Sequence, residues 1–144
     1  LGLYTCFETG GKTDAVIQDS NPRIWAKAEW EWTQAKAETV NEIEKLASAA
    51  SEADTFFFIG YSRTDNDTHQ LNLDAIERQW KGIDKPLVVF LMTFSYSKKR
   101  RHFQELQTYL FEKEKHKKVR AQEALPWQVP GTKWHASAYA KAGE

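Results

Sequence analysis

Residues 25–32 read WAKAEWEW, and this alternation of small or aromatic residues with charged ones predicts a strand. Successive side chains of a strand point to opposite faces. One face then carries residues suited to burial, which are Ala26, Ala28, Trp30 and Trp32. The other face carries Trp25, Lys27, Glu29 and Glu31. Two carboxylates side by side on one face need a reason, because like charges repel.

The composition indicates one globular domain over residues 1–144. The chain is 41% hydrophobic and 28% charged, as is typical of globular proteins. Its longest apolar run, LVVFLM at 87–92, is far shorter than the ~18 residues that cross a bilayer, so we expect no membrane partner. Cys6 is the only cysteine, which excludes an internal disulfide or a cysteine-based zinc site and favours a cytoplasmic location.

Periodicity along the chain predicts the order β-β-β-α-β-α-β-α and therefore an α/β fold. Alternating or wholly apolar runs predict strands over 3–9, 12–19, 24–32, 54–62 and 86–94. Apolar residues spaced three or four apart predict helices over about 34–52, from Asp67 or Thr68 to about 81, and within 97–118. The predicted core covers about 3–94, and a basic helix and an irregular tail follow over 95–144.

The segments 12–19 and 24–32 are expected to pair as a hairpin, and their pattern selects a register. Matching the apolar face of the first segment to Ala26 and Ala28 requires paired residue numbers with an odd sum. A sum of 43 leaves SNPR at 20–23 as a four-residue loop and keeps Pro22, which has no backbone N–H, out of the ladder. In this register Asp14 lies opposite Glu29.

The same register places Lys12 opposite Glu31. The carboxylates of Asp14, Glu29 and Glu31 then lie on one face of the hairpin and converge on about one site. Directly paired side chains have Cβ atoms about 4.5–5.5 Å apart, and like charges there are destabilising unless a cation lies between them. Carboxylate oxygens suit hard divalent ions, so Asp14, Glu29 and Glu31 predict a Mg²⁺ or Mn²⁺ site. The alternative is that Glu29 and Glu31 face water, with Lys12 and Lys27 as cross-strand partners.

A second acidic segment, SRTDNDTH at 62–69, offers Asp65, Asp67 and His69 as ligands. It does not fit a calcium loop, because no glycine stands at the sixth position and no distal glutamate closes it. We therefore interpret it as a loop that caps the following helix.

Asp14 on one strand, a short turn, and E-W-E at 29–31 on the next strand resemble the motif of the PD-(D/E)XK nuclease superfamily. GGKTDAVI, in which the acid follows a glycine turn, resembles the approach to the aspartate of that motif. The resemblance covers roughly residues 3–94. It implies a restriction-endonuclease-like mixed sheet, an antiparallel meander followed by an α-β-α-β crossover, flanked by helices. Glu31 stands where the family usually has lysine, as in a minority E-x-E variant of active restriction enzymes.

The resemblance implies an Mg-dependent (or Mn-dependent) deoxyribonuclease in which Asp14 and Glu29 hold the metal. Glu31 would orient the attacking water or accept its proton. Lys27, or Lys36 early in the next helix, would supply the ammonium that the motif lacks. The resemblance also leads us to expect a homodimer, because many such nucleases cut two strands as dimers.

The zero net charge of the chain conceals an asymmetry. Residues 1–84 carry 8 basic and 15 acidic residues, a net charge of −7, whereas residues 85–144 carry 12 and 5, a net charge of +7. The basic residues cluster in two places and predict contacts to a nucleic-acid backbone. The first cluster is Lys98, Lys99, Arg100 and Arg101, and the second is Lys117, Lys118 and Arg120. A solvated helix face is the alternative, because glutamates are interspersed among these cations.

Two functions of different classes are therefore predicted. The first is an endonuclease that hydrolyses phosphodiester bonds of DNA. The second is a non-catalytic domain of nuclease-like fold, an interaction module for nucleic acid or protein, in which Glu31 in place of lysine marks a decayed site. In the tail, Trp127 and Trp134 are candidates for stacking on a partner or a base.

Overall fold

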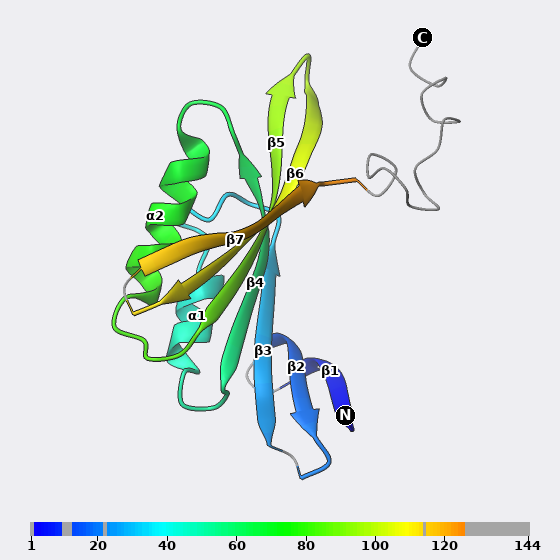
Figure 1. Ribbon diagram of the computed structural model, residues 1–144, viewed down its shortest axis with the longest axis vertical. Helices are drawn as coiled ribbons and strands as arrows, with labels where there is room; N and C mark the ends of the chain where they lie inside the picture. Colours follow the sequence, from blue (N-terminus) through cyan, green and yellow to red (C-terminus); the bar gives the residue numbers. More distant parts are fainter. Residues whose placement is uncertain (1, 10–12, 22, 114, 126–144) are drawn as a thin grey trace, which may run out of the picture.

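The computed structural model describes residues 2–9, 13–21, 23–113 and 115–125. These residues form an α/β fold with one seven-stranded sheet, whose strands lie in chain order from β1 to β7, and two helices (Figure 1). The strands are β1 (Leu3–Thr9), β2 (Thr13–Asp19), β3 (Ile24–Glu31), β4 (Thr55–Arg63), β5 (Leu87–Ser97), β6 (Arg100–Glu112) and β7 (Lys115–Glu123). The helices are α1 (Glu42–Ser48) and α2 (Thr68–Trp80).

The sheet is mixed, with parallel strands at its centre. β3, β4 and β5 are parallel neighbours, whereas β1–β2–β3 and β5–β6–β7 pair antiparallel. Parallel neighbours need a crossover connection, and α1 and α2 supply the two crossovers. An α/β sheet preceded by an antiparallel meander was predicted, and the structure confirms that coarse arrangement.

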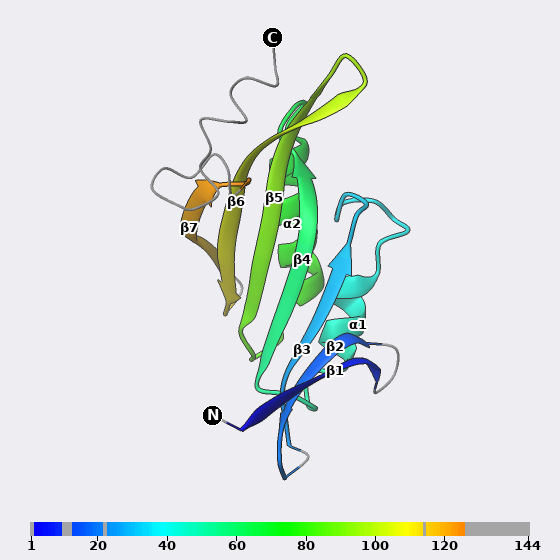
Figure 2. The same cartoon turned by 90° about the vertical axis from the view of Figure 1, so that its right-hand side faces the viewer.

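Both helices cover the same face of the sheet (Figure 1), and no helix of the described residues lies over the opposite face (Figure 2). The core lies between α1, α2 and the covered face. Ile43 and Leu46 of α1 and Ile76 of α2 are almost completely buried there, as are Phe56 and Leu87 of the central strands. The wholly apolar runs of β4 and β5 form central strands, as predicted, but they are not buried on both faces: mainly alternate residues are buried, because the helices cover one face only.

The register predicted for the β2–β3 hairpin is correct. Ala15 pairs with Ala28, Val16 with Lys27 and Ile17 with Ala26, each with a sum of 43. The pairing slips by one residue at the end of the hairpin, where Gln18 pairs with Ile24 through a bulge. Pro22 and Lys12 lie outside the described residues, and so does the predicted pairing of Lys12 with Glu31.

The helix predicted within 97–118 is wrong, because this segment forms β6 and the start of β7. Gln107, Tyr109 and Phe111 are buried at a strict spacing of two, which is the period of a strand. The turn into β6 consists of Lys98 and Lys99, with φ of 47° and 61°. This turn was missed because positive φ at two successive positions is usually met by asparagine or glycine.

The first helix is much shorter than predicted, seven residues in place of about 34–52. The residues before it form a loop that is still tied to the core, since Ala35 and Val40 are 2% and 3% exposed. The second helix matches the prediction, with Leu73, Ile76 and Trp80 buried and Gly82 beyond its end at φ 80°. The tail beyond Leu125, with Trp127 and Trp134, lies outside the described residues.

Neither helix within the described ranges is long and apolar enough to cross a membrane.

The strained turn between β5 and β6 gives a test of the corrected fold. Replacing Lys98 by Asn and Lys99 by Gly relieves two positive φ angles, so we expect the free energy of unfolding to rise by about 0.5–1 kcal/mol. Urea unfolding measures the change. Lys81→Gly, at φ −59°, is the control and should destabilise the chain. A loss of stability in the double variant would contradict the hairpin.

Candidate functional site

The charged row of β3 lies on the face of the sheet that the helices cover. Lys27 and Glu29 pair with Phe56 and Phe58 of β4, and both phenylalanines belong to the core under the helices. Lys27 is 2% exposed and Glu29 is 1% exposed. The alternative that Glu29 faces water is therefore wrong. The expectation of buried tryptophans is wrong as well, because Trp30 and Trp32 belong to the uncovered side and are exposed.

Glu29 lacks the hydrogen bonds that a buried carboxylate normally has. Its Oε2 atom has no hydrogen-bond partner within the described part of the chain. The nearest ammonium, Nζ of Lys45 on α1, is 3.9 Å away from Oε2. Burial, followed by the negative charge of Asp14, raises the pKa of Glu29 to about 7. This carboxyl thus carries a proton for much of the time near neutral pH, and a cation could replace that proton.

Asp14 stands beside Glu29, as the predicted register requires. Its Oδ2 atom accepts a hydrogen bond of 2.8 Å from the backbone N–H of Trp30, which holds the carboxylate against β3. A hydrogen bond between the Asp14 and Glu29 side chains contributes to the raised pKa of Glu29. The structure therefore brings together two of the three predicted carboxylates.

Glu31 does not join this pair. Its Oε1 accepts hydrogen bonds from the backbone N–H groups of Trp32 (2.6 Å) and Thr33 (2.8 Å). The bond from Thr33 holds the pKa of Glu31 below its ordinary value, against the smaller effect of burial. Among the described residues, no three His, Cys, Asp or Glu side chains form a group that could hold a metal ion. The predicted convergence of three acids is thus wrong, because the Glu31 carboxylate accepts hydrogen bonds from the backbone N–H groups that follow β3.

The ammonium near the acid pair belongs to Lys45, a residue that the sequence analysis did not select. Lys45 Nζ lies 3.1 Å from Oε1 of Glu42 as well as 3.9 Å from Glu29. Although burial acts to lower it, the hydrogen bond to Glu42 and the charges of Glu29 and Asp14 hold the pKa of Lys45 above its ordinary value. The three-residue spacing of Glu42 and Lys45 predicts that the two side chains meet on one face of a helix. It does not predict the contact of Lys45 with Glu29, because that contact depends on how α1 packs on β3.

The two lysines that were predicted to supply the ammonium lie elsewhere. Lys27 is buried, and its Nζ donates a 2.6 Å hydrogen bond to Oε2 of Glu52. Lys36 is exposed in the loop after β3, where its backbone N–H donates to Asn72.

The predicted backbone-binding residues are all exposed, but on strands and not on a helix. Lys98 and Lys99 form the turn of the β5–β6 hairpin, and Arg100 and Arg101 begin β6. This hairpin tip projects beyond the end of β4 (Figure 2). The second group lies on the outer strand β7 and consists of Lys117, Lys118 and Arg120.

The segment 62–69 spans the end of β4, a loop and the start of α2, and the predicted capping of this helix by a side chain is not formed. Asp65 accepts hydrogen bonds from Arg63, and Asp67 stands at the N-terminus of α2 without a side-chain cap hydrogen bond. His69 is held between Ser62 (2.7 Å from Nδ1) and Tyr109 (2.9 Å from Nε2).

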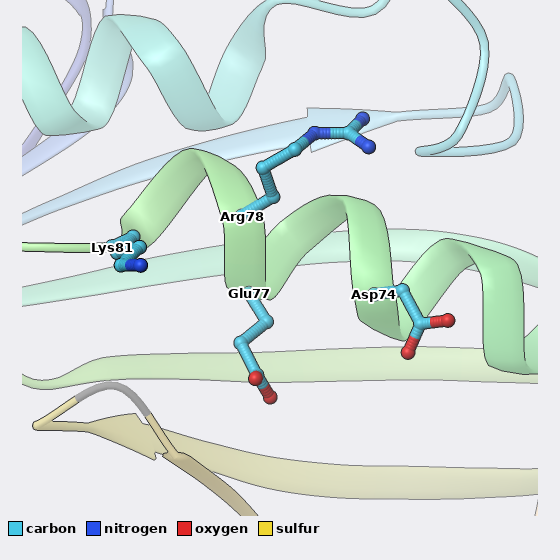
Figure 3. Close-up of a pocket in the computed structure, with 4 residues that line it drawn as sticks. All are labelled: Asp74, Glu77, Arg78 and Lys81. Atoms are coloured by element: carbon cyan, nitrogen blue, oxygen red, sulfur yellow. The ribbon is translucent and has the colours of Figure 1, made fainter.

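The surface of the described residues has several hollows, of which two are relevant to the predicted site residues and to the helices. One of about 370 Å³ lies where β3 and β4 end, against the β5–β6 hairpin, and is lined by Trp32, Thr33, Gln34, Arg63, Phe94, Tyr96 and Arg101. The other, of about 390 Å³, runs along α2 and is lined by Asp74, Glu77, Arg78 and Lys81. Figure 3 shows that these four side chains point in different directions along the helix, so they do not converge on a ligand.

The buried Glu29 gives a prediction for stability against pH. Its pKa is 4.5 ordinarily and about 7 in the folded chain, so folding binds a proton between these values. The free energy of unfolding must then fall as the pH rises through this window, by ~1.4 kcal/mol per unit. In Glu29→Gln the amide imitates the protonated acid. We expect the variant to match the parent below the window and to be more stable by a few kcal/mol above it.

Urea unfolding in EDTA at a series of pH values measures this difference. Glu44→Gln, which changes an exposed acid on α1, is the control and should keep the fall in stability. Parallel pH profiles for the parent and Glu29→Gln would contradict the prediction.

Comparisons with known proteins do not assign the chain to a family. No protein-family model matches it, and no curated protein matches it significantly. A solved structure that resembles it is the YaeQ protein from Xanthomonas axonopodis pv. citri, with a TM-score of 0.36 and 8% sequence identity over 83% of this chain and 69% of that one. A similarity at this level carries no conclusion about fold or function.

Proposed function

We propose that this chain is a metal-dependent phosphodiesterase that cuts DNA, an endonuclease of the PD-(D/E)XK type in its E-x-E form. Two features support the proposal. An antiparallel β1–β2–β3 meander leads into two α-helical crossovers, which is the restriction-endonuclease-like order of elements. Asp14 on the second strand and Glu29 on the third are neighbours, which is the arrangement that the family motif implies.

The observation that carries the proposal is the Oε2 atom of Glu29, which is buried and has no hydrogen-bond partner within the described residues. Leaving a buried polar atom unpaired costs free energy, so such an atom in a native fold calls for an explanation. The Asp14 carboxylate and the Lys45 ammonium lie beside it. The site therefore has two of the three acids predicted to bind a cation, whereas the third, Glu31, lies elsewhere.

The residues fit a divalent ion of the Mg²⁺ or Mn²⁺ kind. Magnesium is commonly held by one or two carboxylates together with water and substrate phosphate, so Asp14 and Glu29 are sufficient. When bound, such an ion polarises a phosphate and lowers the pKa of a coordinated water. Asp14 is already oriented by the N–H of Trp30, and Glu29 must lose its proton before it can be a ligand.

The other charged residues have separate roles in this proposal. Lys45 supplies the ammonium that the motif places on β3, and it offsets negative charge that develops on the phosphate. Glu31 anchors the end of β3 and the start of the following loop. Lys27, paired with Glu52, is a structural residue. The basic β5–β6 tip and β7 contact the phosphodiester backbone. A homodimer and a cytoplasmic location remain predictions.

One observation favours the second function, a non-catalytic interaction module. The carboxylate of Glu31 is used by its own backbone, so the third position of the motif is not free to act on a water. Binding of nucleic acid without cleavage would select this function.

A divalent ion should stabilise the folded chain. We expect Mn²⁺ to raise the melting temperature of the parent, by an amount equivalent to about 2.7 kcal/mol when the ion is at roughly 100 times its Kd. The rise should be larger above pH 7 than below it, because the Glu29 proton competes with the ion. Differential scanning calorimetry measures the shift. Glu29→Gln should show none, and an equal shift in that variant would place the ion elsewhere.

Cleavage of supercoiled plasmid in Mg²⁺ or Mn²⁺ tests the activity. Removing a residue that only supports a metal ligand lowers activity by roughly 10- to 100-fold. Glu29→Gln removes a proposed ligand itself, so its cleavage rate should fall by more than that. Lys45→Gln should lower the rate by about 10²- to 10³-fold, as removal of a group that stabilises developing charge does. The matched controls are Glu44→Gln and Lys36→Gln, which should cut at the parental rate. No cleavage with any divalent ion would refute the nuclease and leave the interaction module.

A further inference from the structure

The hollow at the end of β3 is built on aromatic rings and arginines. It lies outside the carboxyl ends of β3 and β4, the place where open α/β sheets usually bind ligands. Trp32, which lines it, follows directly after the last residue of β3 and is three positions from Glu29. The hollow therefore begins three positions along the chain from Glu29, whose own side chain is buried under the helices.

The aromatic rings of this hollow are accessible. Trp32 is 63% exposed and Tyr96 is 47% exposed. Behind them, the ring of Tyr61 lies 5.1 Å from Trp32 and 5.6 Å from Phe103. This second layer of rings holds Trp32 on one side and leaves its other side open to a ligand. Two exposed rings in one hollow offer a surface on which a further flat ring can stack.

Two arginines add positive charge to the same wall. Arg101 lies over the rings of Tyr61 and Phe94, at 5.2 and 5.1 Å, and has no carboxylate partner within the described ranges. Arg63 lies over Tyr96 at 5.6 Å and is paired with Asp65. Arg101 directly follows Lys98, Lys99 and Arg100, the basic residues at the tip of the β5–β6 hairpin. Ring stacking with a free guanidinium beside it matches a nucleobase and its phosphate.

We propose that this hollow, which we call the stacking hollow, binds an unpaired nucleotide, with its base on Trp32 and Tyr96 and its phosphate at Arg101. The inference rests on the proposed function and gives its substrate class: nucleic acid with a single-stranded segment. A base in a duplex hides both faces in its stack and cannot lie on an indole ring. The hollow, at about 370 Å³, falls within the size of small-molecule sites.

Binding is tested on the full chain carrying Glu29→Gln, in EDTA, so that no cleavage contributes. The probes are fluorescein-labelled oligothymidine and oligouridine of about 12 nucleotides and a blunt duplex of the same length. We expect the single strands to bind more tightly than the duplex. Adding Trp32→Ala should weaken single-strand binding by about 5- to 100-fold, and Trp32→Phe should restore most of it. Anisotropy measures all of these affinities.

Trp25→Ala is the matched control, because Trp25 is an exposed tryptophan at the opposite end of the same strand. It should leave single-strand binding unchanged. Arg101→Gln should reduce the slope of log K against log salt by about 0.7, the contribution of one phosphate of a single strand. Tyr96→Ala gives a second variant in the hollow, and circular dichroism shows that each variant is folded.

Equal affinity for the duplex and the single strands, or equal effects of Trp32→Ala and Trp25→Ala, would overturn the stacking hollow. Failure of the nuclease proposal gives a different result, namely tight binding that depends on Trp32 with no cleavage by the parent in any divalent ion. Preference for oligothymidine or for oligouridine separates DNA from RNA as the source of the strand.

Discussion

The alternation of side chains along β3 is the constraint on which the site depends. Because one face of this strand lies under α1, Lys27 and Glu29 are carried into the interior whatever their charge. A buried charge needs a partner or must be neutralised. Lys27 is paired with Glu52, whereas Glu29 retains a proton up to about pH 7 and has Lys45 at a distance. Of these two buried residues, Lys27 is neutralised by an ion pair and Glu29 by a proton. Glu29 keeps an oxygen atom, Oε2, that accepts no hydrogen bond from the described residues.

Helix α1 is short, and its packing decides which cation Glu29 meets. Ile43 and Leu46 anchor it to the core, at 0% and 1% exposed. Lys45, the residue before Leu46, is thereby directed toward Glu29 of β3, and Glu42, the residue before Ile43, pairs with Lys45. A shift of one residue would present a different side chain to Glu29. The packing of two aliphatic residues therefore sets the electrostatics of the acid pair.

A second buried network holds the other half of the covered face. Asn72 Nδ2 donates to Ser62 Oγ (2.9 Å) and Tyr109 donates to Gln107 (2.5 Å). The Tyr109 oxygen must then accept from Nε2–H of His69, which leaves Nδ1 to accept from Ser62. Burial lowers the pKa of His69, in accord with this neutral form. The chain of donors joins β4, α2 and β6, and it supports the sheet end on which the stacking hollow lies.

Local patterns predicted the type and order of the first seven elements and the register of the β2–β3 hairpin, because turns, periodicity and a proline restrict these choices strongly. They failed after Ser97, where residues that favour helices, such as Leu106, Gln107 and Leu110, form a strand because neighbouring β5 supplies its hydrogen bonds. They also failed for Lys45, whose contact with β3 depends on how two elements pack. The pairing of Asp14 with Glu29 could be predicted, but its burial under α1 could not, since WAKAEWEW alone does not state which face is covered.

The lysines of β7 have a second effect besides the proposed contacts to nucleic acid, because they lie on an outer strand of the sheet. Among the described residues β7 is an outer strand of the sheet, with a neighbouring strand on one side only. Charged side chains on such a strand oppose edge-to-edge association. Under the proposed function, neutralising Lys117 and Lys118 would remove two phosphate contacts, and it would also remove the protection of this edge. Lost binding in such a variant has to be separated from self-association, and light scattering makes that separation.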